Sequence, residues 1–178
     1  MKKGSYGIYL LAILLLGFFL RVFLYKTGTF FIDVNSFIAW SNTLVEGGFK
    51  NFYSSVWSDY LPGYLYVLWF LGKVKNFISV DQLFVFKLPA ILSDLATGYL
   101  VYLIVKKFRD QKTALIASGF YIFNPALIFN STLWGQVDSV TVLFYLLTIY
   151  LFAINPTLSS LALSLGTAVK PQVALAAV

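Results

Sequence analysis

The seven acidic side chains must carry any acid–base chemistry that this sequence performs, because the chain contains no His and no Cys. The same absence removes disulfides, thiol catalysis, Ser-His triads, histidine general bases and nearly every zinc site. A positioned carboxylate acting as a general base is therefore the chemistry to look for.

Asp33 is the acid with the most informative surroundings. It precedes residues 34–45, where apolar residues recur at the spacing of an amphipathic helix lying along a membrane surface, and Gly47-Gly48 would end that helix. Two interpretations stay open. Asp33 either caps free backbone N–H groups at the start of the helix, or lies at the rim of a cavity as a general base.

A second acid stands in the sequence Asp59-Tyr60-Leu61-Pro62-Gly63-Tyr64. Pro62 is natural at the start of a helix, which explains much of this motif. An acid beside two tyrosines also suits the binding of sugar hydroxyls. We therefore treat Asp59 and Tyr60 as candidate substrate-binding residues.

Three charged residues, Lys87, Asp94 and Lys170, lie inside long apolar blocks. Such residues are costly in a membrane and usually mark a bundle interior, a water-filled cavity or a site. Lys87 and Asp94 share a helix face about 10 Å apart, so we do not expect them to pair directly. Snorkelling explains Lys87 and does not explain Asp94. Lys170 precedes a helix-breaking proline, and a purely structural role for it stays open.

The remaining polar cluster is Asn130 to Asp138, which includes Trp134 and Gln136. Asp138 as the N-cap of the following helix would explain the aspartate alone. It would not explain the amides and the indole that accompany it. We expect acids, amides, aromatic rings and cations to converge on one outer face of the protein.

The elements that position these residues are predicted to be membrane helices, since 60% of the chain is hydrophobic and 11% is charged. Spans of roughly 20 apolar residues are expected at 5–25, 83–105, 113–130, 137–154 and 158–178. Residues 60–72 are too few to span. The fold class is thus an all-α polytopic membrane protein. Its net charge of +6 is dispersed, which argues against a nucleic-acid partner.

The basic residues give the orientation by the positive-inside rule. Lys2 and Lys3, together with the cluster between Lys106 and Lys112, are expected inside, so residues 26–82 form a long outer loop. We read residues 5–25 as an uncleaved anchor in preference to a signal peptide. Residues 1–178 are expected to form one transmembrane domain, the N-terminal part of a longer module, because the sequence stops within an apolar segment.

In order along the chain, these motifs resemble the GT-C membrane glycosyltransferases, and in particular the prokaryotic proteins related to the second mannosyltransferase of GPI-anchor synthesis. The residues that carry the resemblance are Phe31-Ile32-Asp33, Asp59-Tyr60-Leu61-Pro62-Gly63-Tyr64, Lys87-Leu88-Pro89 through Asp94-Leu95, Asn124-Pro125, Trp134-Gly135-Gln136-Val137-Asp138-Ser139 and Lys170-Pro171-Gln172. The sequence departs from the family in its length and at Leu61, where a second proline is frequent.

The resemblance implies a GT-C-like helical bundle whose long first outer loop bears interfacial amphipathic helices. It implies transfer of a hexose, with mannose the first expectation, from a polyprenyl- or dolichyl-phosphate sugar to a lipid or glycan acceptor at the outer or lumenal face, with inversion. Asp33 matches the catalytic base. Lys87 and Lys170 are candidates to hold the phosphate, and the other substrate-binding candidates are Asp59, Tyr60, Asp94, Trp134, Gln136, Asp138 and Gln172.

No metal site is demanded by spacing, although Asp33 with Asp138 is a candidate pair for one Mg²⁺ or Mn²⁺ ion. The expected location is the plasma membrane of a prokaryote or the endoplasmic reticulum of a eukaryote. Two alternatives remain. One is a transporter or flippase of lipid-linked substrates that uses Lys87, Asp94 and Lys170 as intramembrane charges, and the other is a non-catalytic membrane subunit.

Overall fold

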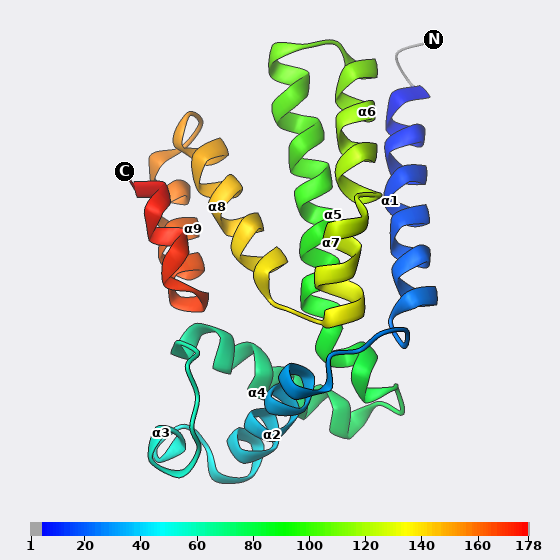
Figure 1. The fold of residues 1–178 in the computed structure, drawn as a ribbon. Coiled ribbons are helices and arrows are strands. Elements are labelled where there is room, and N and C mark those ends of the chain that lie inside the picture. The colour runs from blue at the N-terminus through cyan, green and yellow to red at the C-terminus, as the bar shows by residue number, and fades with distance from the viewer. Residues whose placement is uncertain (1–4, 178) are drawn as a thin grey trace.

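The computed structural model describes residues 5–177, and every regular element within that range is a helix (Figure 1). The prediction of an all-α membrane protein is confirmed. A bundle of helices stands on a separate layer of helices (Figure 1). The expected inner position of Lys2 and Lys3 concerns residues outside the described range.

Two helices are long and apolar enough to cross a membrane, α1 (Ser5–Leu24) and α5 (Gln82–Phe108). A third crossing is available if α6 (Gln111–Ile122) and the helical turns after it, α7 (Pro125–Ile128) and the π-helix η1 (Phe129–Trp134), form one span bent by 42°.

The bend in this third segment has a local cause in the sequence. Pro125 disfavours helical geometry at Asn124, which adopts an extended conformation and ends α6. The Asn124 side chain then accepts a 2.9 Å hydrogen bond from the backbone N–H of Ala126 and starts the next helix. The predicted helix over 113–130 is therefore present but broken.

The last two predicted spans are shorter than expected. Helix α8 (Asp138–Phe152) has 15 residues and α9 (Pro156–Val169) has 14, so neither reaches the roughly 20 residues that a full crossing needs. Prolines set the limits of α9: Pro156 begins it, and Pro171 forces Lys170 into an extended conformation that ends it. A 3₁₀ helix, η2 (Pro171–Ala177), follows.

The layer beneath the bundle is the predicted outer loop, folded into α2 (Phe31–Gly47), α3 (Phe52–Ser55) and α4 (Pro62–Phe77). Helix α4 is not among the candidate spans, which agrees with the prediction that residues 60–72 do not cross. Helices α2 and α4 pack closely, because Ser41 Oγ donates a 2.7 Å hydrogen bond to the Leu68 carbonyl. Their shared core includes Phe37, Leu44 and Tyr64.

A buried ion pair joins α1 to α5. Arg21 donates hydrogen bonds of 3.0 and 3.3 Å to Asp94 Oδ2, and both side chains are fully buried. This pairing accounts for the aspartate that snorkelling could not explain. As predicted, Lys87 and Asp94 have separate partners.

Candidate active site

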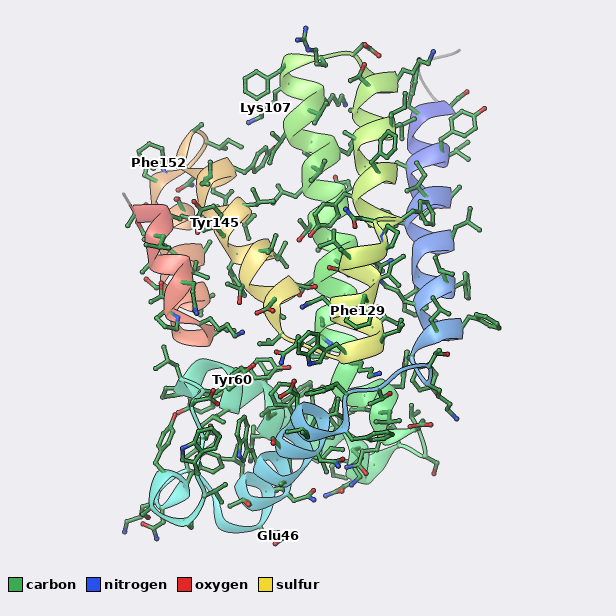
Figure 2. The ribbon with its side chains drawn as sticks, viewed as in Figure 1. Glu46, Tyr60, Lys107, Phe129, Tyr145 and Phe152 are labelled. Atoms are coloured by element: carbon green, nitrogen blue, oxygen red, sulfur yellow. The ribbon has the colours of Figure 1, made fainter. Side chains whose placement is uncertain are left out.

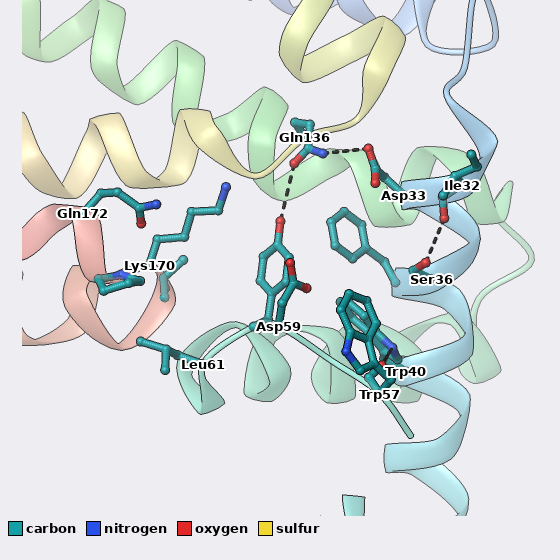
Figure 3. Close-up of a pocket in the computed structure, with 14 residues that line it drawn as sticks. Ile32, Asp33, Ser36, Trp40, Trp57, Asp59, Leu61, Gln136, Lys170 and Gln172 are labelled. Carbon is teal, nitrogen blue, oxygen red and sulfur yellow. Dashed lines mark hydrogen bonds between the residues drawn. The ribbon is translucent and has the colours of Figure 1, made fainter. Parts of the chain in front are cut away.

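A cavity of about 480 Å³ lies where the helical layer meets the bundle (Figure 3). Helix α2, the connection from α3 to α4, the turn before α8 and the junction of α9 with η2 all contribute to its wall. Six of the predicted site residues line it: Asp33, Asp59, Tyr60, Gln136, Lys170 and Gln172.

Asp33 lies in the first turn of α2 and is not its N-cap. The helix begins three residues earlier than expected, with Phe30 at the cap position and no side-chain capping bond. Asp33 Oδ2 instead accepts hydrogen bonds from Trp134 Nε1 at 2.5 Å and Gln136 Nε2 at 2.7 Å. Among residues 5–177 no hydrogen bond reaches the other oxygen, Oδ1, of this cavity-lining carboxylate.

Tyr60 stands between the helical layer and the bundle (Figure 2). Its hydroxyl donates a 3.4 Å hydrogen bond to Gln136 Oε1, and its ring packs edge-on against Phe37. Burial raises the pKa of the Tyr60 phenol well above its usual value, so the group stays a donor. Gln136 thus connects Tyr60 to Asp33 (Figure 3).

Lys170 and Asp138 form an ion pair, with 2.6 Å between Nζ and Oδ1. Asp138 is the first residue of α8 but makes no capping bond, because its carboxylate is directed to Lys170 and to Asn130, whose Nδ2 lies 3.3 Å from Oδ2. The Lys170 ammonium also lies 5.5 Å from the centroid of the Tyr60 ring. This places a cation on the cavity wall beside the Tyr60–Gln136–Asp33 chain.

The other predicted site residues do not line this cavity. Trp134 and Asp138 each contact a residue of the cavity wall. Trp134 donates a hydrogen bond to Asp33, and Asp138 accepts one from Lys170. Lys87 and Asp94 are fully buried, and both contact the segment that precedes Trp134. Contact between Lys87 and a phosphate stays a prediction that this burial does not favour.

Eight of the residues that line the cavity were not predicted as site residues, and Ser36, Trp40 and Trp57 are the ones among them with polar side-chain groups. Ser36 and Trp40 follow Asp33 by three and seven positions, so they share its face of α2. Helical spacing from Asp33 was the signal that could have identified them. Trp57 lies in irregular backbone after α3, where no periodicity applies.

The candidate cation pair, Asp33 and Asp138, has hydrogen-bond and ion-pair partners of its own in the structure. Residues 5–177 contain no cluster of three or more Asp, Glu, His or Cys side chains. Asp138 is already neutralised by Lys170, and Asp33 Oδ2 accepts two hydrogen bonds, so the predicted pair does not offer two free carboxylates to one cation.

One comparison with known proteins identifies a family. The profile of the dolichyl-phosphate-mannose-protein mannosyltransferase family matches residues 62–175, which is more than half of the chain. No curated protein and no solved structure matches. The match includes Trp134, Gln136, Asp138 and Lys170, and the two residues that hold Asp33 are among them. The chain therefore belongs to the dolichyl-phosphate-mannose-protein mannosyltransferase family and is an integral-membrane glycosyltransferase of the mannosyltransferase type.

Proposed function

We propose that the protein transfers a hexose, mannose in the first instance, from a polyprenyl- or dolichyl-phosphate sugar to an acceptor hydroxyl, with inversion at the anomeric carbon. The observation that supports this proposal is the position of Asp33. This residue precedes the family match, yet two residues within the match, Trp134 and Gln136, hold one of its carboxylate oxygens on the cavity wall.

Asp33 is the proposed general base. Its Oδ2 is fixed by two donors, which orients the carboxylate, and the described residues donate no hydrogen bond to Oδ1. A base must be positioned within hydrogen-bond reach of the proton that it accepts. An acceptor hydroxyl in the cavity would meet that condition at Oδ1.

The reaction is a single displacement. The acceptor oxygen forms a bond to the anomeric carbon while its proton passes to Asp33, and the bond between that carbon and the phosphate oxygen breaks. The polyprenyl phosphate leaves with the electron pair of the broken bond. It needs no proton from an acid, so one carboxylate suffices for the chemistry.

Lys170 is the proposed phosphate ligand. A cation aimed at the oxygen on which negative charge develops stabilises the departure of that oxygen. Lys170 lines the cavity with 22% of its side chain exposed, and Asp138 holds its ammonium at 2.6 Å. Gln172 and Tyr60 supply hydrogen-bonding groups on the same wall, and Asp59 supplies a second carboxylate for sugar hydroxyls.

The architecture, the membrane location and the acceptor are proposed from the same site. We propose a GT-C-like architecture, with the cavity at the outer or lumenal face of a plasma or endoplasmic-reticulum membrane. The acceptor is proposed to be a lipid or glycan, as in the GPI mannosyltransferase II branch. The exposed indole of Trp57 and the acid Asp59 on the cavity wall support an acceptor that carries sugar hydroxyls.

The experiment is a transfer assay with the full-length protein in lipid vesicles. Radiolabelled mannose is offered as polyprenyl-phosphate mannose or as the nucleotide sugar GDP-mannose, with lipid-linked glycans and peptides as acceptors. The proposal expects labelled product and free polyprenyl phosphate from the lipid donor alone, with the anomeric configuration inverted. Transfer from GDP-mannose, retention of configuration, or no product from either donor would contradict it.

A further inference from the structure

Two buried charged residues of α5 have no place in the mechanism above. Lys87 and Asp94 lie on α5, and neither side chain is exposed. Burial of a charge is costly unless strong partners compensate, so the partners of these two residues indicate what they do.

Lys87 binds two separate parts of the chain. Its ammonium donates to the carbonyls of Thr132 and Leu133 at 2.8 and 3.0 Å, and to the Tyr25 carbonyl and Thr29 Oγ1 at 2.7 and 2.9 Å. The first two acceptors are in the last turn of η1, where carbonyls lack partners within the helix. The other two are in the connection from α1 to α2.

Asp94 binds the same π-helix one residue earlier. Its Oδ2 accepts a 2.6 Å hydrogen bond from Ser131 Oγ while it also pairs with Arg21. Residues 131, 132 and 133 are therefore each bound by a charged group of α5.

Trp134 and Gln136 follow this anchored segment directly and hold Asp33. Gly135, between them, has a φ of 90°, so the turn depends on a conformation that favours glycine. Lys87 also fixes the connection that leads into α2, which carries Asp33. Lys87 therefore hydrogen-bonds both to the segment that precedes the donors Trp134 and Gln136 and to the connection that precedes Asp33.

We propose that Lys87 and Asp94 are positioning residues, which anchor residues 131–133 and so hold Trp134 and Gln136 against the Asp33 carboxylate. They touch neither the sugar nor the phosphate. The proposed effect of these residues on the rate of transfer rests on the proposed function. Their effect on the position of Trp134 can be tested in the free protein, without substrate.

The geometric test uses ¹⁹F NMR of the full-length protein labelled with 5-fluorotryptophan, in which a Trp134→Phe variant identifies the Trp134 resonance. Lys87→Met and Ser131→Ala are expected to shift or broaden that resonance and to leave those of the other tryptophans in place. Lys106→Met, at an exposed lysine of the same helix, is the matched control and should change none. An unmoved Trp134 resonance in the first two variants would overturn the proposal.

Ser131→Ala removes one hydroxyl and keeps both charges, so it decides the geometric question if Lys87→Met does not fold. The kinetic test compares transfer rates. Displacement of the base is expected to lower kcat about 10- to 100-fold, with the donor KM held within about twofold.

A raised donor KM with unchanged kcat in Lys87→Met would overturn the proposal, because it would make Lys87 a phosphate ligand. The experiments distinguish failure of the proposed function from failure of the proposed anchoring. If the wild-type protein transfers no sugar but the Trp134 resonance responds to both substitutions, the proposed function fails and the anchoring of the turn stands.

Discussion

Gln136 Nε2 lies 2.7 Å from Asp33 Oδ2 although 103 residues separate the two in sequence. This contact joins the first turn of α2 to the turn before α8, and Gln136 Oε1 extends it to the Tyr60 hydroxyl. One amide therefore orients the proposed base and connects it to the aromatic wall of the cavity.

Replacing Gln136 by Leu should lower kcat. A hydrogen bond to a charged group contributes about 1.5–3 kcal/mol, which corresponds to roughly a 10- to 100-fold loss of rate. The measurement is steady-state transfer by the variant in vesicles. Gln111→Leu, at the start of α6 and away from the cavity, should retain wild-type kcat. Equal rates in the two variants would remove Gln136 from the site.

Replacing Lys170 by Met should raise the KM for the lipid donor by about tenfold, because the phosphate would lose its cation, a change of about 1.4 kcal/mol. Lys107 lies at the far end of α5 (Figure 2), so Lys107→Met is the matched loss of charge. The measurement is initial rate against donor concentration. A normal donor KM in Lys170→Met would place the phosphate elsewhere.

Replacing Gly135 by Ala should destabilise the turn that carries Gln136. The φ of 90° is unfavourable for alanine, and the added Cβ would lie 3.0 Å from Val34 Cγ2 and 3.2 Å from Lys87 Cε. The expected loss in the free energy of unfolding is about 1–2 kcal/mol. Thermal unfolding in detergent measures it, with Gly47→Ala as control, since a Cβ at Gly47 meets no atom within 4 Å. Equal melting temperatures would contradict the prediction.

Replacing Arg21 by Leu should be severe, because it leaves Asp94 buried without its cation. Removing one partner of a buried pair costs about 3–5 kcal/mol, whereas replacing both partners with apolar residues is often tolerated. Arg21→Leu combined with Asp94→Leu should therefore recover much of the stability. It should not recover transfer, because Ser131 loses its hydrogen bond to α5.

Urea or thermal unfolding and the transfer assay, applied to both variants, separate these effects. Arg109→Leu, an exposed arginine beyond the end of α5, is the control and should change neither property. A double variant as unstable as Arg21→Leu alone would show that the pair does more than neutralise Asp94.

Local features of the sequence predicted the elements well. Apolar length identified α1 and α5, and the short block at 60–72 was correctly placed outside the spans. The break at Pro156, between residues 154 and 158, was predicted, whereas the apolar run 158–178 overestimated the length of α9, which ends before Pro171. Each proline marks a helix limit in the structure.

The candidate site was predictable in its residue types and not in its contacts. Asp33 was identified, but the choice between an N-cap and a base stayed open, since only tertiary structure brings Trp134 and Gln136 to it. The burial of Lys87 and the pairing of Arg21 with Asp94, 73 residues apart, likewise depend on how the helices pack. Sequence spacing carries no information about such partners.

The most direct test of the account is the pair of kinetic constants for Asp33→Asn, measured with polyprenyl-phosphate mannose and compared with Asp110→Asn at the exposed N-cap of α6. The amide keeps the shape of the side chain but cannot accept the proton. The account predicts a fall in kcat of about 10²- to 10⁴-fold with little change in donor KM, and wild-type behaviour for the control. Wild-type kcat in correctly inserted Asp33→Asn protein would contradict it.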